Sequence, residues 1–322
     1  MIQYDSLYRH NILHWLEEFI RLWNIVMPEA FPLQKALFVR NILQSSNLDL
    51  HRSSMAFLEG RLVGLCIVKS APSENRQNSQ QAEQLWISLI LVDKRLQRNR
   101  IGSTLLKGIH QKPVPVSDIH CGMDPGHLFP GVPDQLHAAI AFFEQAGFQH
   151  TGQAFDLTGN LQNWERKTAP EAFPYLVRRL RPDEQGDLLN LIRQEFSSRW
   201  YEDTKEQLLH ERTPHSVIGL FDGDQLAGFT HVHVPTDNFY LPSVYWQSTG
   251  TLTEGGLGPV GIASQLRGKG LGTWFMEEAL AIMKKEGTTT MCIDWTILVE
   301  FYRKFGFTPV QTYHHYKLDQ LP

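Results

Sequence analysis

Two short runs in the last third of the chain have residue types and spacing suited to chemistry. The first is Arg267-Gly268-Lys269-Gly270-Leu271-Gly272, which follows an apolar segment at 257–262 and precedes helical apolar spacing at 274–285. Glycines allow consecutive backbone N–H groups to point the same way, and a helix N-terminus adds partial positive charge. The spacing R-x-x-G-x-G differs from both common nucleotide loops, G-x-x-x-x-G-K-S/T and G-x-G-x-x-G. It predicts a turn that binds a pyrophosphate, and a merely tight strand-to-helix connection is the alternative.

The second run is Phe301-Tyr302-Arg303-Lys304-Phe305-Gly306-Phe307, which follows an expected strand at 291–295. Tyr302 carries a hydroxyl that can donate a proton, whereas a purely structural tyrosine would pack at the end of an amphipathic helix. Gly306 has a local reason, because a helix C-terminus often needs a residue with positive φ.

Together these runs resemble the GNAT acetyltransferases, whose acyl-CoA loop reads Q/R-x-x-G-x-G/A and whose later helix ends F-Y-x-K-x-G-F. The resemblance implies acetyl-CoA as co-substrate and no metal. It implies that Tyr302 protonates the departing thiolate and that the backbone of Val260 and Ile262 pairs with the pantetheine arm. It also implies a bulge near Gly258-Pro259 with a free amide as oxyanion donor. The residues expected to hold the CoA are Val260, Ile262, Arg267, Gly268, Lys269, Gly270, Leu271, Gly272 and Thr273.

The general base is open at this level. The resemblance favours Glu254 as a catalytic carboxylate at the start of the same strand, although a solvated turn residue is the alternative. Asp294 on the following strand is a second candidate, and a water chain is a third. Many GNAT chains have asparagine seven residues before the tyrosine, where this chain has Trp295. We expect that indole to line the acceptor pocket instead.

The chain also repeats itself. Hairpins with alternating apolar residues occupy 55–68 and 217–230, and each is followed by a third strand and a loop that starts with Gln or Arg. Each half closes on a helix that ends in Gly-Phe, at 147–148 and 306–307. We predict an α/β protein of two tandem GNAT domains, each a mixed, mostly antiparallel central sheet flanked by helices. This organisation resembles that of the mycothiol synthase group.

The predicted domains are 1–165 and 176–322, joined by an irregular segment that carries Pro170 and Pro174. The first lacks two parts of the apparatus, because Arg100 replaces a loop glycine and Phe143 replaces the tyrosine. We therefore expect a degenerate N-terminal domain and a catalytic C-terminal domain. The expectation for Arg100 is that its Cβ disfavours the positive φ of a phosphate loop. Through Arg98 and Arg100 the first half would at most hold a second, non-reacting CoA.

Composition narrows the remaining classes. The chain has 322 residues, a formal net charge of -4 and three scattered cysteines, so nothing favours nucleic acid, a disulfide framework or a cysteine metal site. No apolar run is long enough to span a membrane, and the first residues do not read as a signal peptide, so a cytoplasmic location is expected. Three features with open roles are a Gly/Pro-rich loop at 120–133, a polar stretch at 77–84 and the aromatics Tyr240, Tyr245 and Trp246.

The function predicted from the sequence is N-acetylation of a primary amine on a small molecule, by direct attack in a ternary complex. Protein or peptide N-acetylation and a non-catalytic acyl-CoA-binding regulatory module are the alternatives. A monomer or a homodimer is expected.

Overall fold

The computed structural model describes residues 1–71, 82–169, 173–211, 216–233, 245–246 and 254–319. The chain forms two compact units, one of Met1–Ala154 with Thr312–Pro322 and one of Phe155–Gln311. Within the described part, no helix is both long enough and apolar enough to cross a membrane. The two units are described in turn.

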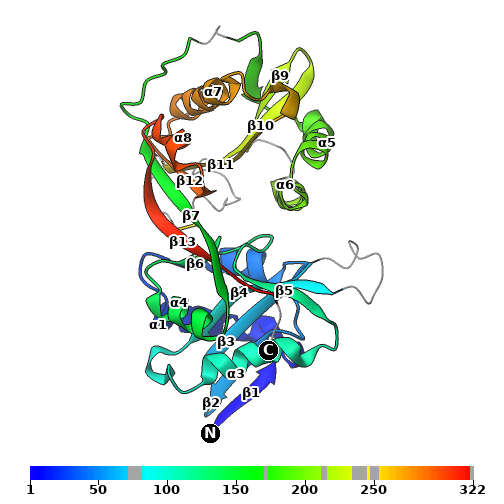
Figure 1. Cartoon of the computed structure of the whole chain (residues 1–322), viewed down its shortest axis with the longest axis vertical. Helices are drawn as coiled ribbons and strands as arrows, with labels where there is room; N and C mark the ends of the chain where they lie inside the picture. The colour runs from blue at the N-terminus through cyan, green and yellow to red at the C-terminus, as the bar shows by residue number, and fades with distance from the viewer. Residues whose placement is uncertain (72–81, 170–172, 212–215, 234–244, 247–253, 320–322) are drawn as a thin grey trace. The chain divides into compact units, whose positions relative to one another are not determined.

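Unit 1 is built on a mixed sheet in the order β1-β2-β3-β4-β5-β13, in which β4 and β5 are parallel and the other pairs are antiparallel (Figure 1). Its core packs the sheet against α3 and α4 through residues such as Leu105 and Phe143. Its strands are β1 Ile2–Ser6, β2 Ser54–Leu58, β3 Arg61–Ser70, β4 Glu83–Val92, β5 Val116–Cys121 and β6 Val132–Pro133, with the end of β13 Thr308–Leu318. Its helices are α1 Leu16–Val26, α2 Lys35–Phe38, α3 Ile101–Lys107 and α4 His137–Gln145.

Unit 2 repeats this plan with the order β8-β9-β10-β11-β12-β7, in which only β11 and β12 are parallel among the described pairs. Helix α7 packs on one face of the sheet, and α5 and α6 pack on the other, around Phe229. The strands are β7 Gln149–Asn160, β8 Leu176–Arg179, β9 Val217–Asp222, β10 Gln225–His233, β11 Glu254–Ile262 and β12 Thr290–Thr296. The helices are α5 Gln185–Glu195, α6 Ser198–Glu211, α7 Leu271–Lys285 and α8 Val299–Arg303.

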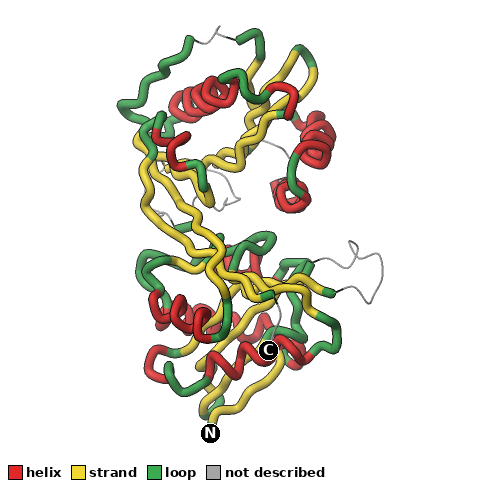
Figure 2. Tube along the Cα trace, in the orientation of Figure 1, coloured by secondary structure: helices red, strands yellow, loops and turns green. Residues whose placement is uncertain are grey.

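Two long strands, β7 and β13, belong to both units (Figure 2). The end of β7 pairs with β12 in unit 2, from Phe155 to Asn160. The end of β13 pairs with β5 in unit 1, through Lys317 and Leu318. Each sheet is therefore completed by a strand from the other half of the sequence. The unit boundaries fall inside these strands, and not at the linker expected between 165 and 176.

The predicted fold class is confirmed, since both units hold a mixed, mostly antiparallel sheet with flanking helices. Both hairpins lie where their alternation indicated, as β2–β3 and β9–β10. The described residues of the segment expected as a linker pack on unit 2, where the Arg166 guanidinium donates to the Glu278 carboxylate at 3.0 Å and Phe173 packs on the core. Most of the polar stretch at 77–84 lies outside the described residues, and its last two residues begin β4.

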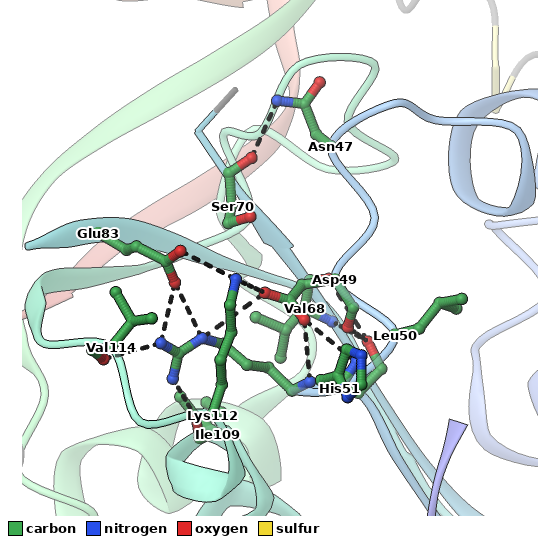
Figure 3. A network of polar contacts seen from close by, with 12 residues as sticks. Asn47, Asp49, Leu50, His51, Val68, Ser70, Glu83, Ile109, Lys112 and Val114 are labelled. Carbon is green, nitrogen blue, oxygen red and sulfur yellow. Dashed lines mark hydrogen bonds and ion pairs between the residues drawn. The ribbon is translucent and has the colours of Figure 1, made fainter. Parts of the chain in front are cut away.

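A buried network of balanced charges holds unit 1 together (Figure 3). Arg52 donates to the Glu83 carboxylate at 2.9 Å and lies 3.6 Å from Asp49, while Lys112 contacts the same two carboxylates at 2.9 and 3.1 Å. Burial acts to raise the pKa of Glu83, but hydrogen bonds from Lys112 and Arg52 outweigh it and lower that pKa. Two cations thus face two anions, the pattern of a structural network.

The loop at 120–133 is a rigid part of unit 1. The ammonium of Lys69 lies 2.6 Å from the Asp124 carboxylate, and both side chains are fully buried. The same ammonium donates to the carbonyl of Pro125 at 2.8 Å. Phe129 stacks on Trp23 with ring centroids 5.8 Å apart. These are the contacts of a connection packed into unit 1.

Candidate active site

The glycine-rich turn presents a row of backbone amides ahead of α7. Gly268 and Gly270 have φ of 78° and 79°, and Gly270 caps the helix without a side-chain hydrogen bond. Among the described residues, no acceptor is bonded to the N–H groups from Gly268 to Gly272. Residues Gly268, Lys269 and Gly270 of the turn are exposed, whereas Leu271 at the start of α7 is buried. A helix N-terminus with free amides and a left-handed entry is the geometry that binds phosphate groups.

Arg267, at the start of this turn, contacts the end of β11 and the end of α5. Its Nε donates to the carbonyl of Ile262 at 2.7 Å, which ties the start of the turn to the end of β11. Its guanidinium also lies 3.8 Å from Glu195, and that carboxylate accepts the backbone N–H of Ser264 at 2.8 Å. In this geometry the Arg267 side chain stabilises the shape of the loop more directly than it could bind a charged ligand. Lys269 and Thr273 lie on the turn and on the first turn of α7.

Strands β11 and β12 separate in the middle of the sheet. Their parallel pairing ends at Leu257 opposite Ile293, although both strands continue. Strand β11 bulges at Gly258-Pro259 against β10, where two residues face the single residue His231. Beyond the bulge, Val260 and Ile262 pair only with β10, so their edge toward β12 has no partner strand among the described residues. An edge of this kind can pair with an extended ligand.

The space between β11 and β12 beyond Leu257 and Ile293 is called the gap below. Strand β12 carries a second bulge directly beside this gap. Asp294 and Trp295 together oppose only Asp156 of β7. Trp295 has φ of 42°, which is rare for a bulky residue, and its N–H donates to the Asp156 carboxylate at 3.0 Å. Bulges next to active sites re-aim side chains. Here the bulge aims the Asp294 carboxylate at β11, since a Cβ built on Gly258 would lie 3.1 Å from its Oδ1.

Asp294 is the carboxylate with the strongest perturbation in unit 2. Burial, reinforced by the charge of Asp156, raises the pKa of Asp294 to about 7, and the Arg199 guanidinium partly opposes this. Asp203 raises it further. A carboxyl group that titrates near neutrality can take a proton from an ammonium or amine at physiological pH.

Arg199 and Asp203 of α6 lie near Asp294 and influence its pKa. Arg199 stacks on the Trp295 ring at 3.7 Å from its centroid and lies 3.2 Å from the Asp203 carboxylate. The indole of Trp295 therefore packs against α6, and its place in an acceptor pocket stays a prediction. Sequence reasoning missed Asp156, Arg199 and Asp203, because no local pattern marks a residue that becomes a neighbour only through folding.

Tyr302 lies on α8 and packs into the core of unit 2, with an exposed fraction of 6%. Burial, followed by the charge of Asp294, raises the pKa of its hydroxyl above the usual range. The hydroxyl therefore stays protonated at any pH of interest, as a proton donor must. Gly306 has φ of 88°, in line with its expected role at the helix end.

Glu254 is placed differently. It pairs with Thr290 in the closed part of the sheet, before the strands separate. By strand alternation it shares a face with Gly258, which lies about 13 Å farther along the strand. The structure therefore brings Asp294, and not Glu254, to the gap. Tyr240 lies outside the described residues, while Tyr245 is buried and meets Trp246 edge to face at 6.2 Å.

Among the described residues, no group of three or more His, Cys, Asp or Glu side chains has a geometry that could hold a metal ion. His231 faces α6, where its Nε2 lies 3.1 Å from the Thr204 hydroxyl, and burial lowers the pKa of its ring to about 4. It is therefore neutral.

Unit 1 has a similar backbone at the matching place, with other side chains. Its parallel pairing also ends early, at Ile87 opposite Cys121, and the next position is Gly122 where unit 2 has Asp294. Its loop has the same left-handed residues, because Arg98 and Arg100 have φ of 66° and 60°. The Cβ of Arg100 disfavours this conformation, as expected, by about 1–2 kcal/mol, but the loop adopts it nevertheless.

The structure consists of two α/β units of the same plan, arranged in tandem along the chain. By sequence, residues 186–307 match the model of the acetyltransferase (GNAT) family. The match covers most of unit 2 and agrees with the resemblance noted in the sequence. Among curated proteins, none matches the sequence of this chain.

Solved structures share the fold over the whole chain. One is a GCN5-related glucosamine N-acetyltransferase region of a fungal multi-domain GH3 beta-N-acetylglucosaminidase, with a TM-score of 0.85, 20% identity and 99% of this chain covered. This chain spans 38% of the length of that protein. A GCN5-related N-acetyltransferase from Sphaerobacter thermophilus has a TM-score of 0.65 and 14% identity over 100% of this chain and 96% of its own. A tandem GNAT protein from the clavulanic acid biosynthesis pathway has a TM-score of 0.65 and 16% identity over 100% and 99%.

Proposed function

We propose that the chain is an acetyl-CoA-dependent N-acetyltransferase that acetylates a primary amine of a small molecule, with its active site in unit 2. The observation that carries this proposal is the arrangement around the gap between β11 and β12. A carboxylate whose pKa is about 7 and a protonated tyrosine lie beside it, and a turn of unbonded amides follows it along the chain.

In this proposal the turn from Gly268 to Gly272 holds the pyrophosphate, and the open edge of Val260 and Ile262 pairs with the pantetheine arm. The acetyl group then lies in the gap, near the bulge at Gly258-Pro259, where a backbone amide polarises its carbonyl. Unit 1 would serve as the degenerate partner of this catalytic unit.

The chemical step follows from these positions. The neutral amine attacks the thioester carbonyl, so a C–N bond forms and, after the tetrahedral intermediate, the C–S bond breaks. Asp294 accepts the proton that the amine nitrogen loses, and Tyr302 donates a proton to the departing thiolate. The products are the N-acetyl amine and CoA. Asp294 takes the place of Glu254 as our preferred base, because only Asp294 reaches the gap.

Direct attack is preferred over a cysteine acyl-enzyme. Burial raises the pKa of Cys66 to about 12, and it raises that of Cys121 as well, so neither thiol forms a thiolate readily. Cys292 lies in the closed part of β12, paired with β7 and β11.

The charges around Asp294 indicate the kind of acceptor. Three carboxylates, those of Asp156, Asp203 and Asp294, surround one guanidinium, that of Arg199. A net negative site favours a cationic amine and disfavours one that also carries a phosphate or carboxylate. An amino sugar without phosphate, or a polyamine, fits this pattern, and the fold shared with the fungal glucosamine N-acetyltransferase region makes glucosamine the first acceptor to test.

The test is a screen of CoA release from acetyl-CoA with glucosamine, glucosamine 6-phosphate, spermidine, free amino acids and a peptide with a free N-terminus. We expect turnover with an unphosphorylated small amine, and loss of turnover in Tyr302→Phe and Asp294→Asn. Asp222→Asn is the matched control, because it removes an exposed carboxylate of unit 2 at the turn after β9. Turnover only with the peptide would favour protein acetylation. Binding of acetyl-CoA without turnover of any amine would favour a regulatory module.

A further inference from the structure

We infer that Asp156, which lies on strand β7 in unit 2, is a positioning residue for Asp294. It holds the Asp294 side chain in the gap and controls the pH at which Asp294 loses its proton. The inference rests on the proposed function only for the part that concerns turnover. Asp156 belongs to the first half of the sequence, so the catalytic half would depend on a side chain from the degenerate half.

The first support is the bulge itself. Asp156 is the only β7 residue between Phe155, which pairs with Thr296, and Leu157, which pairs with Ile293. Its Oδ1 accepts the Trp295 N–H at 3.0 Å, and its side chain is 8% exposed. This hydrogen bond satisfies an amide that the bulge removes from the strand ladder, which would otherwise be costly to bury.

The second support is the backbone at Trp295. A tryptophan at φ of 42° costs on the order of 1–3 kcal/mol and persists only where its surroundings compensate. The Asp156 carboxylate supplies a compensating bond to that same residue. Because Trp295 directly follows Asp294, the direction of the Asp294 side chain toward Gly258 depends on this conformation.

The third support is electrostatic. The charged and titratable groups that face Asp294 come from three elements. They are Asp156 on β7, Arg199 and Asp203 on α6, and Tyr302 on α8. Asp203 lies 3.2 Å from Arg199, which offsets part of its charge. Of the charged neighbours, Asp156 raises the pKa of Asp294 most, after burial itself.

Asp156→Asn separates the hydrogen bond to Trp295 from the effect of charge on Asp294, because an amide oxygen can still accept the Trp295 N–H while the negative charge is lost. Asp156→Ala removes both. Thr158→Val is the matched control on the same strand, since the Thr158 hydroxyl also bonds to the β12 backbone, at the carbonyl of Met291, but carries no charge.

The readout is the titration of Asp294 by carbon NMR in full-length protein labelled at the aspartate carboxyl carbon, with the resonance assigned by its loss in Asp294→Asn. In parallel, kcat/KM is measured against pH with the best amine from the screen. We expect a midpoint of about 7 in the wild type and in Thr158→Val, and a lower midpoint in Asp156→Asn. The acid limb of kcat/KM should move to lower pH by the same amount.

Asp156→Ala should lower kcat by about 10²-fold, the usual cost of a misplaced catalytic group. If that variant does not fold, Asp156→Asn still decides the matter. An Asp294 midpoint that is the same in Asp156→Asn as in the wild type overturns the inference. A midpoint that moves while the acid limb stays supports the coupling and refutes Asp294 as the base, so the two failures are distinguishable.

Discussion

Substitution of Gly270 by aspartate should weaken acetyl-CoA binding through charge alone, and the structure supplies a control that isolates the charge. Gly270 has φ of 79°, and among the described residues a Cβ there would meet only the Phe173 ring, at an ordinary contact distance of 3.9 Å. Asn and Asp both tolerate this left-handed conformation better than other side chains. Gly270→Asp and Gly270→Asn therefore carry a similar backbone cost and differ by one negative charge.

The size of the charge effect follows from Coulomb's law. A carboxylate about 5 Å from a phosphate charge, in surroundings with an effective dielectric constant near 20, is repelled by about 3 kcal/mol. That corresponds to about a 10²-fold higher Kd for Gly270→Asp than for Gly270→Asn. Because the turn is exposed, the difference in Kd between the two variants should become smaller in ~1 M salt, where the Debye length is about 3 Å.

The assay is calorimetric titration of both folded variants with acetyl-CoA at low and high salt, with circular dichroism as the check on folding. Equal affinities of Gly270→Asp and Gly270→Asn at low salt would refute the placement of the pyrophosphate at this turn. A large loss already in Gly270→Asn would instead show that the glycine backbone itself is required.

The other predictions concern the chemical step and the division between units. Tyr302→Phe should keep the acetyl-CoA Kd and lower kcat by about 10²–10⁴-fold, and a rate within twofold of wild type would assign the acid role to another group. Asp294→Asn should abolish the acid limb near pH 7 while Glu254→Gln retains turnover, and the reverse result would make Glu254 the base. Because the folded pKa of Asp294 lies above its unfolded value of about 4, the stability that its proton provides is complete below pH ~4 and is lost as pH rises through about 7. Chemical denaturation should show this loss in the wild type and not in Asp294→Asn, and identical pH dependence would contradict the shift. Arg100→Asp should leave turnover intact where Gly270→Asp abolishes it, and the opposite pattern in rate assays would place the active site in unit 1.

The sequence by itself determined the features that depend on neighbouring residues. The turn from Gly268 to Gly270 needs positive φ at two nearby positions, which glycine reveals directly. The hairpins, the helix after the turn and the Phe301–Phe307 run are also local, since period and capping mark them. The internal repeat adds the fold class, because two copies of one pattern must build two similar units.

Tertiary structure alone decided the features that join distant parts of the chain. Asp156 reaches Trp295 across 139 positions of sequence, and β13 returns to β5 from the other end of the chain. No period or spacing encodes such pairings, so sequence reasoning could not predict the exchanged strands or that Asp294, and not Glu254, lies beside the gap between β11 and β12. In the loop of unit 1, tertiary structure overrides a local conformational preference. Propensity argues against left-handed Arg98 and Arg100, but a preference of about 1–2 kcal/mol per residue is small beside the packing of the strand and helix that the loop connects.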